Sequence, residues 1–144
     1  MSYGTDGLTY NVLRAANLQR IPLFKDKKGR LAHPKIEGQP VGFDWPLSKW
    51  SNAVFGEGGE AANVIKKIER GDFDLEDEGV REMLGKELAD VAIYLDILAH
   101  RAGVNLGRAI IDKFNEVSER QDISIRIRED GSDWMYSKGL GVPQ

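Results

Sequence analysis

Four acidic residues form two pairs with the same spacing. Glu57 and Glu60 are separated by two residues, as are Glu87 and Asp90, and 26 residues lie between the two pairs. Side chains three positions apart project from one face of an α-helix. Because carboxylates without cysteine or histidine among them favour hard cations, the pattern predicts a site for Mg²⁺ or Mn²⁺.

Both acid pairs fall on helix faces that should point toward a core. On a wheel at about 100° per residue, Glu57 and Glu60 lie inside the apolar sector of their segment. That sector contains Trp50, Ala53, Val54, Ala61, Val64, Ile65 and Ile68. Glu87 and Asp90 project between two apolar groups of their own segment. Ionised carboxylates in such places require ion pairs, hydrogen bonds or a metal.

Lysine and arginine side chains supply the opposite charge. Lys113 and Arg120 share the apolar face of a later segment, and Lys67 lies close to Glu60 in wheel angle. Inward acids and cations together indicate a polar pocket in a helical bundle. Two interpretations stay open: a structural charge network, or a polyphosphate held through Mg²⁺, with Glu60 accepting the proton of an attacking water.

A di-iron carboxylate centre is disfavoured. Such a bundle uses a Glu-x-x-His motif on each of two helices. The two histidines of the chain, His33 and His100, form no motif of this kind.

The elements that must position these residues are predicted to be four main helices in an all-α domain. They cover about 8–20, 46–71, 80–101 and 105–120, with Thr5 or Asp6, Pro46 and Asn105 at their starts. Residues 21–45 are rich in Lys, Gly and Pro and are predicted to form a long loop, while ISIRIR is either one edge strand or irregular. We expect a single domain over 1–144, with its core at about 8–120 and a C-terminal tail at 121–144.

Composition limits the classes of function. The chain has 144 residues, a net charge of −3 and no cysteine, which excludes disulfides and thiolate metal sites. It shows no basic face for duplex nucleic acid, no signal peptide and no apolar run of about 20 residues that could cross a membrane. We therefore expect a cytoplasmic protein that binds neither nucleic acid nor membrane.

The two acid motifs make the sequence similar to a known family. Glu57-x-x-Glu60 followed by Glu87-x-x-Asp90 resembles the signature of MazG-like proteins, the all-α nucleoside triphosphate pyrophosphohydrolases. The segments WSNAVFGEGGEAANVIKKIERG and KFNEVSER look like the phage and bacterial branch of that family. The resemblance covers residues 8–120, and a phage-encoded protein would act in the host cytoplasm.

The resemblance implies an activity and an assembly. Members bind two or more Mg²⁺ ions through four acids, here Glu57, Glu60, Glu87 and Asp90, and cleave a nucleoside triphosphate to the monophosphate and pyrophosphate. They form dimers, or tetramers built from dimers, with sites shared between subunits. A homodimer or homotetramer of four-helix bundles is therefore expected here.

Phosphate-binding positions are also implied by the resemblance. Lys113, Asn115 and Arg120 of KFNEVSER match family positions that hold the phosphates. Lys67 is added as a phosphate ligand because of its wheel angle near Glu60. The wheel points Asn115 away from the Lys113 face, so Asn115 either serves a site across a subunit interface or lies in an irregular part of its helix.

The sequence departs from the family at three glycines. Gly56 stands where many members carry a further Glu directly before the first motif, which leaves the number of metal ions open. Gly58 and Gly59 replace bulkier residues inside the motif. Their missing side chains are expected to leave room for nucleotide or for a partner subunit.

Three residues are candidates for contact with the base. Trp50 is either a stacking partner or a core aromatic, and Asn17 and Arg20 either read a base edge or lie in solvent or at an interface. The resemblance to phage-type members favours dGTP and GTP. The basic loop segment KDKKGR either closes over the nucleotide or is solvated.

Two other functions remain alternatives. The same scaffold could hydrolyse another nucleotide pyrophosphate of the phosphoribosyl-ATP type. The other alternative is a non-enzymatic helical oligomerisation module, whose inward charges would fix only a subunit interface.

Overall fold

The computed structural model describes residues 8–128 and 134–136. The chain divides after Gly103 into two compact units, residues 1–103 and 104–144, which are described separately. The first unit contains the helices α1 to α3 and the long loop. The second contains α4 and a short β-hairpin.

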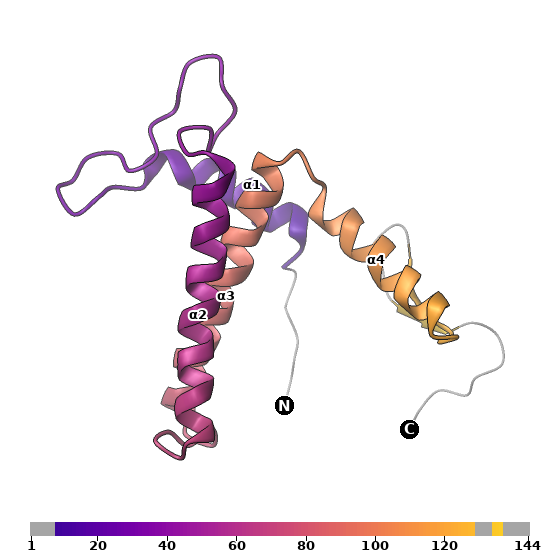
Figure 1. Ribbon diagram of the computed structural model, residues 1–144. Helices are drawn as coiled ribbons and strands as arrows, with labels where there is room; N and C mark the ends of the chain where they lie inside the picture. The colour runs from indigo at the N-terminus through magenta and orange to yellow at the C-terminus, as the bar shows by residue number, and fades with distance from the viewer. Residues whose placement is uncertain (1–7, 129–133, 137–144) are drawn as a thin grey trace. The chain divides into compact units, whose positions relative to one another are not determined.

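Two long helices that run side by side dominate the first unit (Figure 1). They are α2 (Leu47–Glu69) and α3 (Glu78–Arg101). Pro46 precedes α2, and the carboxylate of Asp77 accepts hydrogen bonds from the first amides of α3. Gly71 and Gly103 follow the two helices with positive φ, a conformation that glycine adopts without strain.

The shorter helix α1 (Tyr10–Arg20) packs against α3. Thr9 caps it by accepting a hydrogen bond from the amide of Val12. The short 3₁₀-helix η1 (Ile21–Leu23), which contains Pro22, follows at once. Ile21 of η1 joins Trp50 of α2 and Ile97 of α3 in a buried hydrophobic cluster.

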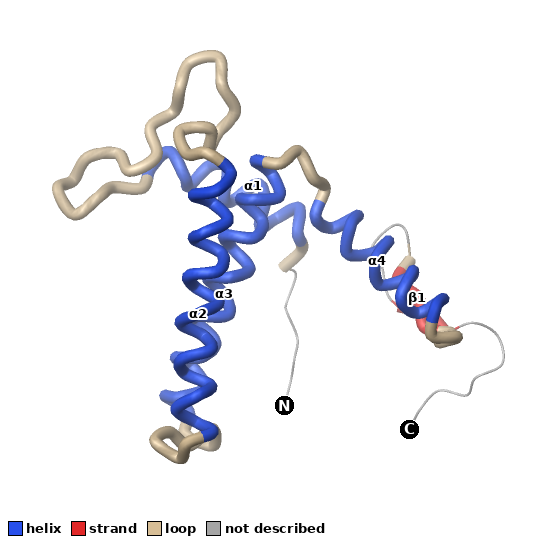
Figure 2. The backbone as a smooth tube through the Cα atoms, in the orientation of Figure 1, coloured by secondary structure: helices blue, strands red, loops and turns tan. Residues whose placement is uncertain are grey.

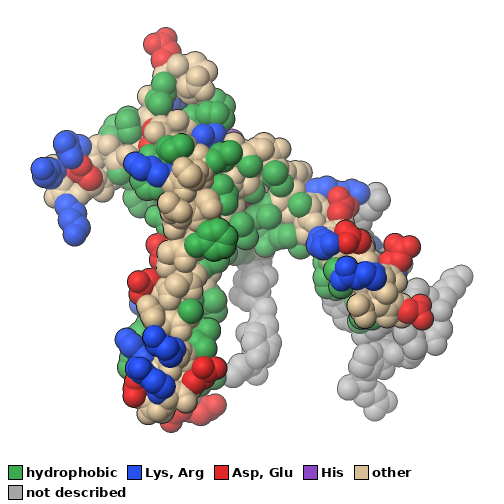
Figure 3. Space-filling model, in the orientation of Figure 1, with side chains coloured by type: hydrophobic (Ala, Val, Ile, Leu, Met, Phe, Trp, Pro, Cys, Tyr) green, Lys and Arg blue, Asp and Glu red, His purple; other side chains and the backbone are tan. Residues whose placement is uncertain are grey.

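A long loop, residues 24–46, connects η1 to α2 and makes two successive excursions away from the helices (Figure 2). The first is a tight hairpin, in which Asp26 binds the amides of Lys28 and Arg30 and an isolated bridge joins Lys25 to Leu31. Lysine and arginine side chains gather at its exposed tip (Figure 3). The second excursion is tied to the helices, because the Trp50 indole donates to the carbonyl of Gly42 at 2.8 Å.

The second unit contains one helix and one strand pair. Helix α4 (Leu106–Arg120) begins at Asn105, whose side chain caps it. Strands β1 (Ile125–Ile127) and β2 (Trp134–Tyr136) pair in antiparallel register. The Asn115 amide binds both main-chain groups of Ile127, at 2.9 Å to the carbonyl oxygen and 2.8 Å to the nitrogen. This side chain therefore fixes α4 to β1.

The all-α fold class with four main helices is confirmed. Helix α3 begins two residues earlier than predicted because Asp77 caps it, and α2 ends at Glu69. Thr9 caps α1, whereas the predicted caps Thr5 and Asp6 lie outside the described residues. The ISIRIR segment contains a strand with a partner, and the single domain and the oligomer stay predictions. No helix in the described ranges is long and apolar enough to cross a membrane.

The glycines of α2 allow a stability prediction. A Cβ added at Gly59 meets no atom within 4 Å in the chain. We expect Gly59→Ala to raise the free energy of unfolding by about 0.5–1 kcal/mol, because alanine restricts the unfolded chain and favours the helix. Urea denaturation measures this change.

Gly103→Ala is the matched control, since Gly103 has φ +69° and alanine there should lower the stability. A loss of stability in Gly59→Ala would instead mean that another molecule covers this face of α2 in the folded protein.

Candidate metal site

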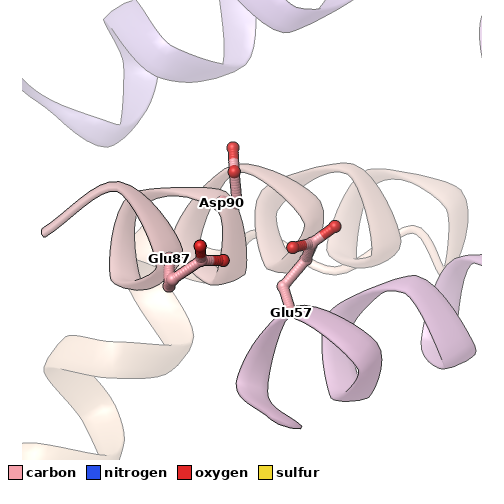
Figure 4. Close-up of side chains that lie close together, drawn as sticks. All are labelled: Glu57, Glu87 and Asp90. Atoms are coloured by element: carbon pink, nitrogen blue, oxygen red, sulfur yellow. The ribbon is translucent and has the colours of Figure 1, made fainter. Parts of the chain in front are cut away.

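Three carboxylates converge where α2 and α3 run side by side. Glu57 projects from α2, while Glu87 and Asp90 project from α3 (Figure 4). One ligand oxygen from each of the three lies within 4.8 Å of the others. We call Glu57, Glu87 and Asp90 the acidic triad.

Burial and the neighbouring acids both raise the pKa of Glu57. Burial raises the pKa of Glu57 most, and the negative charges of Asp90, Glu87 and Glu60 raise it further. Glu57 and Glu87 are half-buried and Asp90 is exposed. No lysine or arginine forms an ion pair with the triad in the described part of the chain, so its charge is uncompensated there.

The triad fits a hard divalent cation. Metal–oxygen distances are about 2.1 Å for Mg²⁺ and about 2.3–2.6 Å for Ca²⁺, so oxygens this close can reach one ion after small side-chain rotations. All three donors are carboxylate oxygens, which Mg²⁺, Mn²⁺ and Ca²⁺ accept. The prediction that these acids could hold a metal ion is therefore supported, and the identity of the ion stays a prediction.

Two triad members also border a cavity of about 210 Å³. Glu57 and Asp90 lie in its wall together with the cationic side chain of Arg20. The rest of the wall is apolar or aromatic and consists of Ile21, Phe24, His33, Trp50, Ile93, Tyr94 and Ile97. The cavity thus joins an acidic edge to an aromatic interior.

Aromatic side chains around Trp50 form part of the wall of this cavity. The ring of Trp50 lies 5.1 Å from that of His33, 4.8 Å from that of Trp45 and 6.3 Å from that of Tyr94. Nδ1 of His33 lies 2.8 Å from a carboxylate oxygen of Asp44, which fixes the imidazole in the loop. The second loop excursion is therefore part of the cavity wall.

Tyr94 connects the aromatic wall to the charges. Burial raises the pKa of its hydroxyl, and the carboxylates of Glu57 and Asp90 raise it further, whereas Arg20 lowers it. The Tyr94 hydroxyl is thus neutral at pH 7 and can donate a hydrogen bond. The charges of the two acids and of Arg20 therefore all act on the Tyr94 hydroxyl.

Glu60, the fourth predicted acid, does not join the triad. It is exposed on α2, one helical turn from Glu57, and it contributes to the field that raises the pKa of Glu57. Lys67 is exposed two further turns along α2, with Nζ 5.2 Å from the centre of the Phe73 ring.

The other predicted phosphate ligands lie in the second unit. Lys113 is exposed and pairs with Glu116 at 2.5 Å, and Arg120 is exposed at the end of α4. Asn115 uses its amide to bind Ile127, which explains why it points away from the Lys113 face. Phosphate contacts of these three residues stay predictions.

The three predicted base ligands have different environments. Trp50 has no exposed surface and belongs to the hydrophobic core, which favours the interpretation as a core aromatic. Asn17 is 1% exposed and is not among the residues that line the cavity. Of the three, Arg20 alone combines solvent exposure with a place in the wall.

Sequence reasoning missed Asp96 and His33. Asp96 is 1% exposed on α3 and binds Arg14 and Asn17 of α1. Arg14 and Asn17 are three residues apart, so a cation and an amide on one helix face were the available sign of a buried acid. Nothing in the local sequence marks His33 as a wall residue.

No protein-family model matches this chain, and no curated protein matches it as a relative.

Metal binding should stabilise the folded protein. We expect Mn²⁺ or Mg²⁺ in large excess over its dissociation constant to raise the melting temperature, because ligand at about 100 times Kd adds about 2.7 kcal/mol. Asp90→Asn should abolish the rise. Glu82→Gln is the control on the same helix, since Glu82 is paired with Lys86 and should leave the rise intact. Equal rises in wild type and Asp90→Asn would contradict the site.

The titration of Glu57 predicts a pH dependence without metal. Because its pKa is raised in the folded state, the folded protein binds this proton more tightly than the unfolded chain. The free energy of unfolding should therefore fall as the pH rises from the ordinary glutamate range through the raised pKa of Glu57. Glu57→Gln should remove this component in urea titrations between pH 4 and 8, and an unchanged pH profile would count against the repulsion.

Proposed function

We propose that the protein is a Mg²⁺-dependent nucleoside triphosphate diphosphatase of the MazG-like type, which hydrolyses a (d)NTP to the (d)NMP and pyrophosphate. The observation that carries the proposal is the continuity between the acidic triad and the aromatic cavity. A metal-binding edge suits phosphates and an aromatic interior suits a base, so one ligand with both parts fits the site best.

The size of the cavity supports a ligand whose base lies inside it and whose phosphates lie outside, over the triad. A volume of about 210 Å³ is below the roughly 300–1,000 Å³ of pockets that enclose a drug-sized molecule. A base and part of the sugar would occupy it. The phosphates would then extend past Glu57 and Asp90 over the triad, where a metal neutralises them.

The chemistry follows from the residues at the triad. A divalent cation held by Glu57, Glu87 and Asp90 would supply charge neutralisation of the phosphates and an acidified water. Glu60, exposed one turn from Glu57, would accept the proton from the water that attacks the α-phosphorus. The bond from that phosphorus to the bridging oxygen then breaks, and pyrophosphate leaves.

The finer assignments rest on the sequence resemblance. They are the preference for dGTP and GTP, the phosphate contacts of Lys67, Lys113, Asn115 and Arg120, and the dimer or tetramer. Exposed apolar side chains support assembly, since Phe55 on α2 is 75% exposed and Leu88 on α3 is 52% exposed. These residues equally fit the non-enzymatic oligomerisation module, which predicts neither metal binding nor turnover.

A pyrophosphate-release assay over the eight common NTPs and dNTPs, with and without Mg²⁺, tests the proposal. We expect Mg²⁺-dependent release, and we expect Asp90→Asn and Glu60→Gln each to lower kcat by about 10²-fold or more while helical content is retained. Glu82→Gln should keep the wild-type rate.

The two variants separate the roles of their residues. Asp90→Asn should lose both turnover and the Mn²⁺-induced rise in melting temperature, whereas Glu60→Gln should lose turnover and keep the rise. Absence of release from all eight nucleotides would refute the enzyme, and retained turnover in Glu60→Gln would exclude Glu60 as the base.

A further inference from the structure

A buried carboxylate on α3 binds two side chains of α1. Asp96 accepts hydrogen bonds at 2.9 Å from Nε of Arg14 and at 2.9 Å from Nδ2 of Asn17. Arg14 also donates to the main-chain oxygen of Asp96 at 3.2 Å. Asp96 is 1% exposed, so its charge depends on these partners.

The network continues from Asn17 to the cavity. Oδ1 of Asn17 accepts a hydrogen bond from a terminal nitrogen of Arg20 at 3.2 Å. The guanidinium carbon of Arg20 lies 5.3 Å from the centre of the Phe24 ring. Arg20 is thus held by an amide on one side and an aromatic ring on the other, and both Arg20 and Phe24 line the cavity.

The charges within this network are distributed unequally. Arg14 forms the ion pair with Asp96, which compensates the buried carboxylate. Asn17 is neutral and stands between Asp96 and Arg20, so it orients the guanidinium without neutralising it. Among the described residues, Arg20 is the only lysine or arginine that lines the cavity. Its positive charge is therefore available to a ligand.

We infer that Arg20 binds a phosphate oxygen of the ligand at the metal edge of the cavity, and that Asn17 and Asp96 are positioning residues that hold it there. The inference rests on the proposed function. Arg20 shares the wall with Glu57 and Asp90, and it acts with them on the Tyr94 hydroxyl. A group between a guanidinium and a metal-binding acid edge must be anionic, and a planar guanidinium matches phosphate oxygens.

The alternative is that the network only fastens α1 to α3. Variants of Arg14 and Asn17 can distinguish the two roles of the network. Both side chains bind the Asp96 carboxylate, but only Asn17 also binds Arg20. Arg14→Lys keeps the charge but loses the two-point contact with Asp96, so it weakens the attachment of α1 and leaves Asn17 and its bond to Arg20 in place. Asn17→Ala removes the tether and leaves the ion pair between Arg14 and Asp96 in place.

Steady-state kinetics with the best-cleaved nucleotide are the first test. Arg20→Gln and Asn17→Ala should each raise KM by about tenfold or more with a smaller change in kcat, since they weaken a contact made before the chemical step. The double variant should be no worse than Arg20→Gln alone. Arg14→Lys should lower the melting temperature and keep KM.

Calorimetric binding of inorganic triphosphate with Mn²⁺ is the second test and needs no turnover. Arg20→Gln and Asn17→Ala should weaken this binding by similar factors, while the Mn²⁺-induced rise in melting temperature stays. Unchanged triphosphate affinity and KM in Asn17→Ala, together with a melting temperature lowered as in Arg14→Lys, would reduce the network to fastening.

The outcomes also separate the inference from the proposed reaction. A wild-type protein that cleaves no nucleotide but binds triphosphate through Arg20 would refute the reaction and keep the anion site. A wild-type enzyme whose KM is unaffected by Arg20→Gln would refute the anion site alone. A protein that neither cleaves nucleotide nor binds triphosphate would refute both.

Discussion

The packing of α2 against α3 forces like charges together, and the first unit is organised around that constraint. Three carboxylate oxygens lie within 4.8 Å of one another, and the pKa of Glu57 is raised first by its burial and then by the neighbouring negative charges. The repulsion persists because the apolar contacts of two helices of 23 and 24 residues hold the backbones in place. A cation bound between these acids would convert the repulsion into stability of the folded state.

Helix α3 carries two aspartates whose negative charges have different surroundings. Asp96 is fully buried and is satisfied by Arg14 and Asn17 within the protein. Asp90, six residues earlier and about 9 Å along the helix, is exposed and has no cationic partner among the described residues. The first carboxylate attaches α1 to α3, and the second belongs to the acidic triad, which could hold a metal ion. Arg20 lies where the two arrangements meet, because Asn17 links it to Asp96 and the cavity wall links it to Asp90.

Local sequence signals predicted the helices and most of the acidic site, and long-range contacts account for what they missed. Pro46, Gly103 and Asn105 marked helix ends correctly because caps and stops depend on neighbouring residues. The wheel placed Glu57 and Glu60 in one sector because they differ by about 60°. Which of them faces α3 depends on the rotation of the packed helices, which no single-helix pattern contains. Arg14 and Asp96 are 82 residues apart, so their pairing required the tertiary structure.

Three glycines leave part of the surface of α2 without side chains near Glu57 and Glu60. Gly56, Gly58 and Gly59 each lower helix stability by about 1 kcal/mol relative to alanine, yet α2 persists because Val54, Ala61 and Val64 are buried on either side of them. A Cβ at any of the three would meet open space in the chain. Gly56 lies about 40° from Glu60 around the helix, so the backbone beside this carboxylate is uncovered within the chain, whereas Gly58 lies on the far side of the helix. Because residues four apart are neighbours on a helix, a bulky side chain at Gly56 would lie beside Glu60 and restrict access to its carboxylate.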